Sequence, residues 1–255
     1  MAITTIKSLE RGLQIINILG HSSAPLSLNE IAEHFEIDRS SVFRLLATLL
    51  KHGYVIQDAT TKHYSLGYKV LELSGNFLGY RNIETVLRPI MRQVCMETRQ
   101  NTHCAVLDGS DVVFIAVELP KDTVTINISV GTREPVTATA LGRALLAYMP
   151  QEEQIKHVQQ AKFPPYTINS IRNSAQLFAI LEKVKQTGIA FDNEEYKAGI
   201  ICFAAPVFGY RGNLQFSLGI SGHKDTILPN YDTYAQIVRS AGSEASRLLG
   251  WKSTE

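Results

Sequence analysis

The chain has 255 residues and a formal net charge of +1, with 25 Lys and Arg against 24 Asp and Glu. Its content of 45% hydrophobic and 19% charged residues is that of a globular protein and is too apolar for a disordered one. A chain this close to neutral is not a polybasic protein, so any surface for nucleic acid must be local. No stretch of it reaches the roughly 18 apolar residues of a membrane helix.

The amino-terminal segment and the cysteines both indicate an intracellular protein. Glu10 and Arg11 interrupt the first apolar pattern, which favours an amphipathic helix over a signal peptide. Cys95, Cys104 and Cys202 are odd in number and have no CxxC spacing, so they predict free thiols in place of disulfides or a zinc site. We therefore expect a cytoplasmic protein without a bound metal or cofactor.

Three short helices are predicted in the first part of the chain. Apolar residues recur at helical spacing over residues 8–20: Leu9, Leu13, Ile16 and Leu19. A second helix begins at Ser27, because Ser27 followed by Glu30 makes a capping box. The third helix has Asp38 as its N-cap and ends at Gly53.

The third helix has two different faces, and a hairpin follows it. One face is a buried stripe of Val and Leu. The other has hydroxyls, cations, an aromatic ring and no acid: Ser40, Phe43, Arg44, Ala47, Thr48 and Lys51. Two strand-like runs, residues 54–56 and 63–66, then flank a polar tip at residues 57–62. This order is typical of a winged helix, and a small three-helix bundle with a solvated polar face is the alternative.

We therefore expect a winged helix-turn-helix domain over residues 1–67 that binds double-stranded operator DNA. Its third helix would enter the major groove, and Arg39, Lys51 and Lys62 would contact phosphates. The expected interface residues are on this helix and at the wing tip: Arg39, Ser40, Ser41, Phe43, Arg44, Thr48, Lys51 and Lys62.

A linker helix over residues 68–80 and a second domain over residues 81–255 are predicted to follow. Helices are expected from Asn82, with a kink at Pro89, and over residues 139–149, 151–160, 173–187 and 231–249. Strands are expected over residues 104–107, 112–117, 124–130, 189–191, 201–208 and 214–220. This pattern predicts an α+β domain with an antiparallel sheet.

The start of the helix near Thr139 is a candidate site for an anionic group. Small residues surround it, among them Ala138, Ala140 and Gly142, and they allow a ligand to approach the backbone. A helix N-terminus also offers unpaired N–H groups and the positive end of the helix dipole. Close packing of the small residues is the alternative explanation.

Several stretches resemble the IclR family of bacterial transcriptional regulators. They are residues 8–13, 41–49, 53–55, 64–67, 135–147, 192–195, 202–208 and 219–222, together with Gly199. Because they follow the order of the family over nearly the whole chain, the resemblance is specific. It implies a winged helix, a linker helix and a GAF-like effector-binding domain, in a dimer that can pair into a tetramer on DNA.

The resemblance also implies a repressor that responds to a small metabolite. In this sequence the pocket of the family corresponds to Ala140, Leu141, Asp192, Ile200, Cys202 and Ser221. Thr139, next to Ala140, is expected at the same site. Three positions depart from the family: Gly219 replaces a frequent Ser, Ile201 a frequent Arg, and Glu134 a commonly apolar residue. Asp192 favours a hydroxy- or keto-acid as the effector, and Glu134 leaves a neutral or zwitterionic ligand open.

The sequence carries no motif of a known enzyme class. It has no GxxxxGK[ST] phosphate loop, no HExxH and no GxSxG, and adjacent His103 and Cys104 would point to opposite faces of a strand. We therefore expect no enzymatic activity. Two alternatives are a Cys-dependent hydrolase of a small acyl compound that uses Cys202, and a thiol redox sensor that uses Cys202 or Cys104.

Overall fold

The computed structural model describes residues 5–80, 83–121 and 128–251. The chain divides into two compact units, Met1–Arg81 and Asn82–Glu255. Each unit has a hydrophobic core of its own. In the described part of the chain, no helix is both long enough and apolar enough to cross a membrane.

The first unit is a helix-turn-helix with a two-stranded wing and a following helix, in the predicted order. Its elements are α1 (Lys7–His21), α2 (Leu28–Ala32), α3 (Arg39–Lys51), β1 (Val55–Gln57), β2 (Tyr64–Leu66) and α4 (Tyr68–Tyr80). The two wing strands pair antiparallel, with Val55 opposite Leu66. Tyr64 also forms a bridge to Leu26, which joins the wing to the segment ahead of α2.

Local hydrogen bonds set the helix boundaries of this unit. The predicted capping box is present, because the Glu30 amide donates to Ser27 Oγ at 3.3 Å and the Ser27 amide donates to the Glu30 carboxylate at 2.7 Å. The Asp38 carboxylate caps α3 by accepting from the Ser41 amide at 2.9 Å. Gly53, with φ of 75°, takes the left-handed conformation that ends α3.

The helix predicted over residues 8–20 is present as α1, and its apolar residues lie on two faces. Ile15 and Leu19 are buried in the core, against side chains of α2 and α3. Leu9 and Leu13 are 60% and 53% exposed. Helical spacing groups all of these residues, but it does not show which side of the helix the core covers.

The second unit is an α+β fold around one antiparallel sheet, as predicted. Its elements are η1 (Ile83–Leu87), α5 (Arg88–Thr98), β3 (Asn101–Asp108), β4 (Asp111–Glu118), β5 (Arg133–Pro135), α6 (Ala140–Tyr148), α7 (Gln151–Gln160), α8 (Ser174–Thr187), β6 (Ala190–Asn193), β7 (Ile200–Phe208), β8 (Leu214–His223), α9 (Lys224–Ile227), η2 (Leu228–Asn230) and α10 (Tyr231–Leu248). The strand order is β5-β4-β3-β8-β7-β6, and every neighbouring pair is antiparallel.

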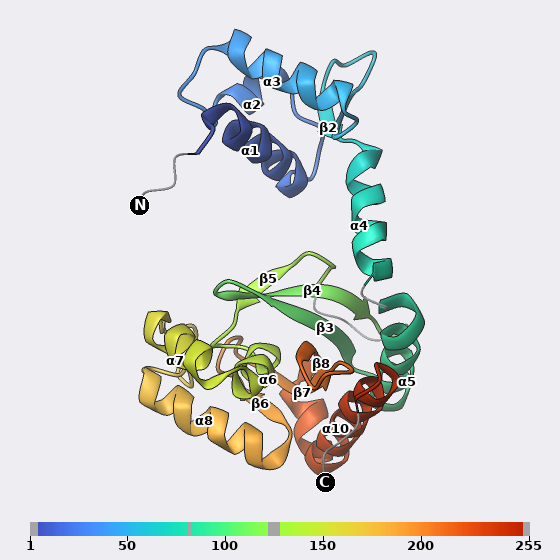
Figure 1. The fold of residues 1–255 in the computed structure, drawn as a ribbon, viewed down its shortest axis with the longest axis vertical. Helices are drawn as coiled ribbons and strands as arrows, with labels where there is room; N and C mark the ends of the chain where they lie inside the picture. The colour runs from blue at the N-terminus through green and yellow to red at the C-terminus, as the bar shows by residue number, and fades with distance from the viewer. Residues whose placement is uncertain (1–4, 81–82, 122–127, 252–255) are drawn as a thin grey trace. The chain divides into compact units, whose positions relative to one another are not determined.

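Helices cover both faces of this sheet. Ala204 of β7 packs in the same cluster as the buried side of α6, whereas a Cβ on Gly242 of α10 would lie 2.8 Å from Ala205. Because successive strand residues point to opposite faces, α6 and α10 lie on opposite sides of the sheet. α7 and α8 lie on the side of α6, and α5 lies on the side of α10 (Figure 1).

Two details of the second unit differ from the prediction. Pro89 does not kink a continuous helix, because η1 is a π-helix and a new helix, α5, begins with Pro89 in its first turn, where its missing N–H costs nothing. The predicted cap Asn82 and residues 124–127 of the predicted strand lie outside the described residues. Residues 128–130 are not in a strand, and the short β5 forms that edge of the sheet.

Candidate functional site

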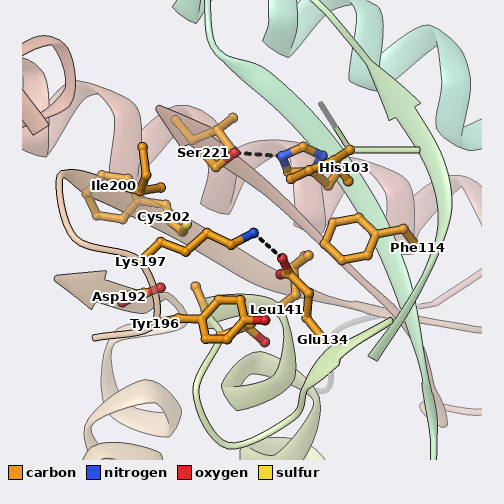
Figure 2. Close-up of a pocket in the computed structure, with 15 residues that line it drawn as sticks. His103, Phe114, Glu134, Leu141, Asp192, Tyr196, Lys197, Ile200, Cys202 and Ser221 are labelled. Carbon is orange, nitrogen blue, oxygen red and sulfur yellow. Dashed lines mark hydrogen bonds and ion pairs between the residues drawn. The ribbon is translucent and has the colours of Figure 1, made fainter. Parts of the chain in front are cut away.

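All seven residues expected at the effector site line one pocket in the second unit (Figure 2). They come from the start of α6 and from strands β6, β7 and β8: Thr139, Ala140, Leu141, Asp192, Ile200, Cys202 and Ser221. The sheet register explains part of this convergence, because Cys202 lies opposite Asp192 on one side and opposite Ser221 on the other. The remaining lining residues are His103, Phe114, Ile128, Glu134, Tyr196, Lys197, Phe203 and Ile220.

The start of α6 presents backbone amides to this pocket. The Thr139 hydroxyl caps the helix by accepting from the Gly142 amide at 3.2 Å, and it donates to the Pro135 carbonyl at 3.2 Å. Its hydrogen-bonding capacity is therefore used within the chain. The amides of Ala140 and Leu141 belong to the first turn, where no carbonyl of the helix can accept from them. They are the donors that this segment can offer a ligand.

Close packing explains the small residue inside α6. A Cβ on Gly142 would lie 2.0 Å from the carbonyl oxygen of Val136, so the helix can approach this segment only because the position is a glycine. The packing explanation therefore holds for Gly142. Packing at Gly142 leaves the amides of Ala140 and Leu141 available to a ligand.

Arg143 joins the start of α6 to β6 and the loop that follows it. The side chain is fully buried, with 0% exposure. It donates to the carbonyls of Thr137 and Ala138 at 3.3 and 3.0 Å and to the carbonyl of Phe191 at 2.8 Å. It also forms an ion pair with Glu195 at 2.6 Å. A buried charge is stable only with such a set of partners, so these segments are held in one arrangement.

Asp192 is a buried acid in the pocket wall. It is 2% exposed, and its carboxylate accepts from the Glu195 amide at 2.8 Å. Burial raises the pKa of Asp192 to about 7, although the charge of Arg143 opposes the shift. At neutral pH this carboxyl is therefore protonated in part of the molecules and can donate a hydrogen bond, which reduces its repulsion of an anionic ligand.

His103 is a pocket residue that the sequence did not indicate. Its Nε2 lies 2.7 Å from Ser221 Oγ, and its ring meets Phe114 edge-on at 5.3 Å. His103 is also paired across the sheet with Gly219, the position where the family often has a hydroxyl. The imidazole thus brings a polar group to the part of the wall from which that hydroxyl is missing.

The His103 and Ser221 pair lacks two features of the base and nucleophile of a hydrolase. Burial lowers the pKa of His103 to about 3, so the imidazole is a weak base at neutral pH. Its Nδ1 has no hydrogen-bond partner among the described residues, whereas a catalytic triad places an acid there.

The thiols do not fit the two cysteine alternatives. Burial, together with the charges of Asp192 and Glu134, raises the pKa of the Cys202 thiol well above its usual value. Burial raises the pKa of Cys104 as well, and that side chain is 0% exposed. A nucleophilic or redox-sensing cysteine needs a lowered pKa and access to solvent. Among the described residues, no group of three or more His, Cys, Asp or Glu could hold a metal ion.

An ion pair lies across the pocket. Lys197 Nζ is 2.7 Å from the Glu134 carboxylate, with side-chain exposures of 42% and 10% (Figure 2). The Lys197 ammonium also lies 5.0 Å from the centre of the Tyr196 ring. Glu134 is the departure from the family noted above, and Lys197 is the cation that accompanies it.

The residues expected at the DNA interface lie on α3 and at the wing. Seven of them are exposed and Ser41 is half-buried; the exposed ones are Arg39, Ser40, Phe43, Arg44, Thr48, Lys51 and Lys62. Phe43 is 52% exposed, which is unusual for a ring without a partner in its own unit. α3 contains no acidic residue, so this face carries only positive charge.

Hydrogen bonds on α3 show which side chains hold others in place and which donors remain available to another partner. Ser40 and Ser41 donate to the Asp38 carboxylate, the latter at 2.7 Å, and Arg44 donates to Ser41 Oγ at 3.2 Å. Thr48 Oγ1 donates to the Arg44 carbonyl at 3.0 Å. The Ser41 hydroxyl, itself held by Asp38, therefore orients the guanidinium, which keeps most of its donors for another partner.

The wing tip is an ordered turn. The Asp58 carboxylate accepts from the amides of Thr60 and Thr61 at 2.9 and 2.7 Å. Lys62, with φ of 60°, adopts the left-handed conformation, and its carbonyl accepts from Gln57 Nε2 at 2.9 Å. The Lys62 side chain is exposed beside this turn.

A winged helix with a cationic helix face, followed by a unit with a small-molecule pocket, defines a ligand-responsive transcriptional regulator. Family models agree with this assignment. The IclR helix-turn-helix domain matches residues 8–59, and the C-terminal domain of the bacterial transcriptional regulator IclR matches residues 76–247. The chain belongs to the IclR family of bacterial transcriptional regulators.

Known proteins resemble the chain over almost its full length. The HTH-type transcriptional regulator XynR of Escherichia coli K12 is 28% identical over 251 residues, which are 96% of this chain and 98% of that protein. The transcriptional repressor IclR of the same organism is 27% identical over 96% of this chain and 90% of that protein. The crystal structure of IclR from Thermotoga maritima has a TM-score of 0.81 and 26% identity, and the match covers 97% and 100% of the two chains.

The raised pKa of Asp192 predicts how pH affects the stability of the second unit. A folded-state pKa above the unfolded value of 3.8 means that the folded form binds the proton more tightly. The stabilisation of the folded form by this proton is complete below about pH 4 and is lost as the pH rises to about 7. Relative to Asp192→Asn, the wild type should therefore lose on the order of 1–3 kcal/mol of unfolding free energy across that window.

Urea unfolding followed by fluorescence of the single tryptophan, Trp251, measures this difference. His103 acts in the opposite sense over the same pH range, because its pKa is lowered, but it is present in both proteins and cancels. Asp225→Asn, at an acid whose side chain is 76% exposed, is the control and should show no such trend. A difference between wild type and Asp192→Asn that stays constant with pH contradicts the prediction.

Proposed function

We propose that the chain is a cytoplasmic repressor that binds double-stranded operator DNA through α3 and the wing, and that a small organic acid in the pocket controls its DNA affinity. The observation that carries the DNA-binding proposal is the exposed face of α3, which has an aromatic ring, cations and no acid. Repression is supported by the similarity to the E. coli repressor IclR. The proposed domains are residues 1–67 for DNA binding, 68–80 for the linker and 81–255 for the effector.

Each group at the proposed DNA interface has a distinct role. Arg44, oriented by Ser41, is placed to bind a base edge, and Phe43 is placed to contact a thymine methyl group. Arg39, Lys51 and Lys62 are placed to contact phosphates, which give affinity without sequence preference. Ser40 and Thr48 can accept hydrogen bonds through their hydroxyl oxygens while donating to their own partners.

Two substitutions separate base contacts from phosphate contacts. Arg44→Ala should weaken binding to the operator by about 1–3 kcal/mol and affect non-specific DNA less, because a bidentate base contact is lost. Lys62→Ala should lower the slope of log affinity against log salt by about one, without a change in sequence preference. Fluorescence anisotropy on an operator selected from genomic fragments measures both.

The control is Lys185→Ala, an exposed lysine on α8 that pairs with Glu182. It should bind the operator like the wild type. Operator binding by Arg44→Ala and Lys62→Ala that is indistinguishable from this control would exclude α3 and the wing as the interface.

Self-association follows from two apolar surfaces of the first unit. On α1 and just before it, Ile6, Leu9 and Leu13 are 68%, 60% and 53% exposed. On α4, Tyr68 and Leu71 are 80% and 71% exposed. We infer that these residues form a dimer interface, which a two-fold operator requires. Leu73, at 45% exposed, adds to it, and the side chain of Phe77, a further apolar residue of α4, lies outside the described residues.

Light scattering on the full chain tests the dimer. The wild type should show twice the 28.3 kDa chain mass, or four times that mass if dimers pair, and Leu9→Glu with Leu71→Glu should show the single chain mass. The control is Ile168→Glu, at a 92% exposed apolar residue of the second unit, and it should behave as the wild type. A wild type at the single chain mass, with and without operator DNA, would refute the dimer.

The pocket supports binding of a hydroxy- or keto-acid. The carboxylate of the ligand would accept hydrogen bonds from the amides of Ala140 and Leu141 at the start of α6, and a further one from the Ser221 hydroxyl. Asp192 would bind the hydroxyl or keto group, since it can accept or, when protonated, donate. Ile200 and Cys202 would contact the apolar part of the ligand.

Ser221→Ala should weaken effector binding by about 1 kcal/mol, the usual contribution of one neutral hydrogen bond. Operator binding by the unliganded protein should not change. Calorimetric titration of the full chain with a panel of small acids measures affinity, with Ser240→Ala, at an exposed residue of α10, as control. Cys202→Trp should abolish binding because it fills the pocket, and full affinity in that variant would place the effector elsewhere.

A further inference from the structure

The proposed effector pocket is small. Its volume is about 30 Å³, which is room for one or two water molecules and not for an organic acid. A ligand can therefore enter only if part of the wall moves. The question is which part can move without disrupting the core.

Most of the wall is packed too tightly to move. Phe114, Leu141 and Ile220 are 2%, 6% and 1% exposed, and they belong to the sheet and to α6. Tyr196 is held by an edge contact with Tyr166, with ring centres 4.9 Å apart. Displacing Phe114, Leu141 or Ile220 would open voids in the protein interior, which is unfavourable, and displacing the half-buried Tyr196 would break its ring contact.

Lys197 differs from the buried side chains of the wall because it can move into solvent. Its side chain is 42% exposed and flexible, and its ammonium reaches across the pocket to the Glu134 carboxylate (Figure 2). Rotation of this side chain into solvent opens the pocket and leaves the sheet and α6 in place. We call Lys197 and Glu134 the closing pair.

Opening the closing pair affects its two members unequally. The Lys197 ammonium is solvated when it leaves. Glu134 cannot follow it, because it is 8% exposed and lies on β5, paired across the sheet with Val112. A buried carboxylate without a partner is strongly unfavourable. Whatever enters the pocket must therefore supply a hydrogen-bond donor to Glu134.

We propose that Lys197 closes the effector pocket through its ion pair with Glu134, and that the effector that opens it carries a hydroxyl or ammonium group for Glu134 in addition to its acid group. This inference rests on the proposed function of the pocket. A hydrocarbon end or a keto oxygen would leave Glu134 without a donor, and a second carboxylate would be repelled by it. Of the two acids proposed above, this selects the hydroxy-acid. Glu134 and Lys197 are then specificity-determining residues.

Alkylation of Cys202 in the full chain measures closure without any ligand. Cys202 lines the pocket, and Cys104 is 0% exposed and serves as an internal reference. With iodoacetamide, Cys202 of Lys197→Ala should react about tenfold faster than that of the wild type, because reactivity follows access. Charge alone predicts the reverse, since Lys197 lowers the pKa of the Cys202 thiol. Acceleration therefore reports opening.

Two further variants control this experiment. Lys224→Ala removes a lysine whose side chain is also 42% exposed, paired with Glu194 at 3.4 Å, and it should react like the wild type. Lys197→Arg keeps the charge and should also react like the wild type, which shows that substitution at this position is tolerated. An equal or slower rate for Lys197→Ala overturns the proposal.

Four three-carbon acids test the class of ligand by their protection of Cys202. In the wild type, 3-hydroxypropionate and β-alanine should protect, and propionate and malonate should not. The stronger of the two protecting acids decides between a hydroxyl and an ammonium group. In Glu134→Leu the order should reverse, with propionate protecting best. Equal protection by all four acids, protection by none, or an unchanged order in Glu134→Leu overturns the assignment.

The closing pair and the proposed function can fail separately, because they are read by different assays. An acid that changes operator affinity while Lys197→Ala reacts no faster leaves the regulator intact and refutes the closing pair. The expected alkylation rates, combined with no effect of any acid on operator affinity, support the closing pair and refute effector control.

Discussion

The arrangement of the pocket depends on one buried charge. Arg143 binds the two carbonyls just ahead of α6, the carbonyl of Phe191 in β6 and the carboxylate of Glu195. These groups belong to segments about 50 residues apart, and the guanidinium reaches all of them. Its planar set of donors fits several acceptors at once, which a lysine could not do. The α6 amides and Asp192 therefore face the same cavity.

The caps of α2 and α3, the helix from Thr139 and the end of α8 at Gly188 could all be predicted because each depends on residues within a few positions. The convergence of the seven pocket residues was available only through family resemblance, since no periodicity relates the start of α6 to three strands. The acid-free face of α3 could also be predicted from the sequence, because it depends on one helix alone.

The other contacts of the site could not be predicted from the sequence because they form only in the folded chain. His103 meets Ser221 across 118 positions, and Lys197 meets Glu134 across 63, so both contacts exist only once the sheet and its loops are in place. The sequence predicted the helix that carries Leu9 and Leu13 but did not separate these exposed side chains from the buried ones. A helix with apolar residues on two sides gives the same sequence pattern as one with a single broad buried stripe.

Location and selectivity of the proposed site come from different residues. The start of α6 and Ser221 match the family and fix where an acid group can bind. Glu134 and Gly219, which the sequence comparison set apart from the family, lie opposite Lys197 and His103. The closing pair is neutral as a whole, and His103 is uncharged because burial lowers its pKa to about 3. With little net charge to offer, this wall can discriminate among acids only through the hydrogen bonds that their second group makes.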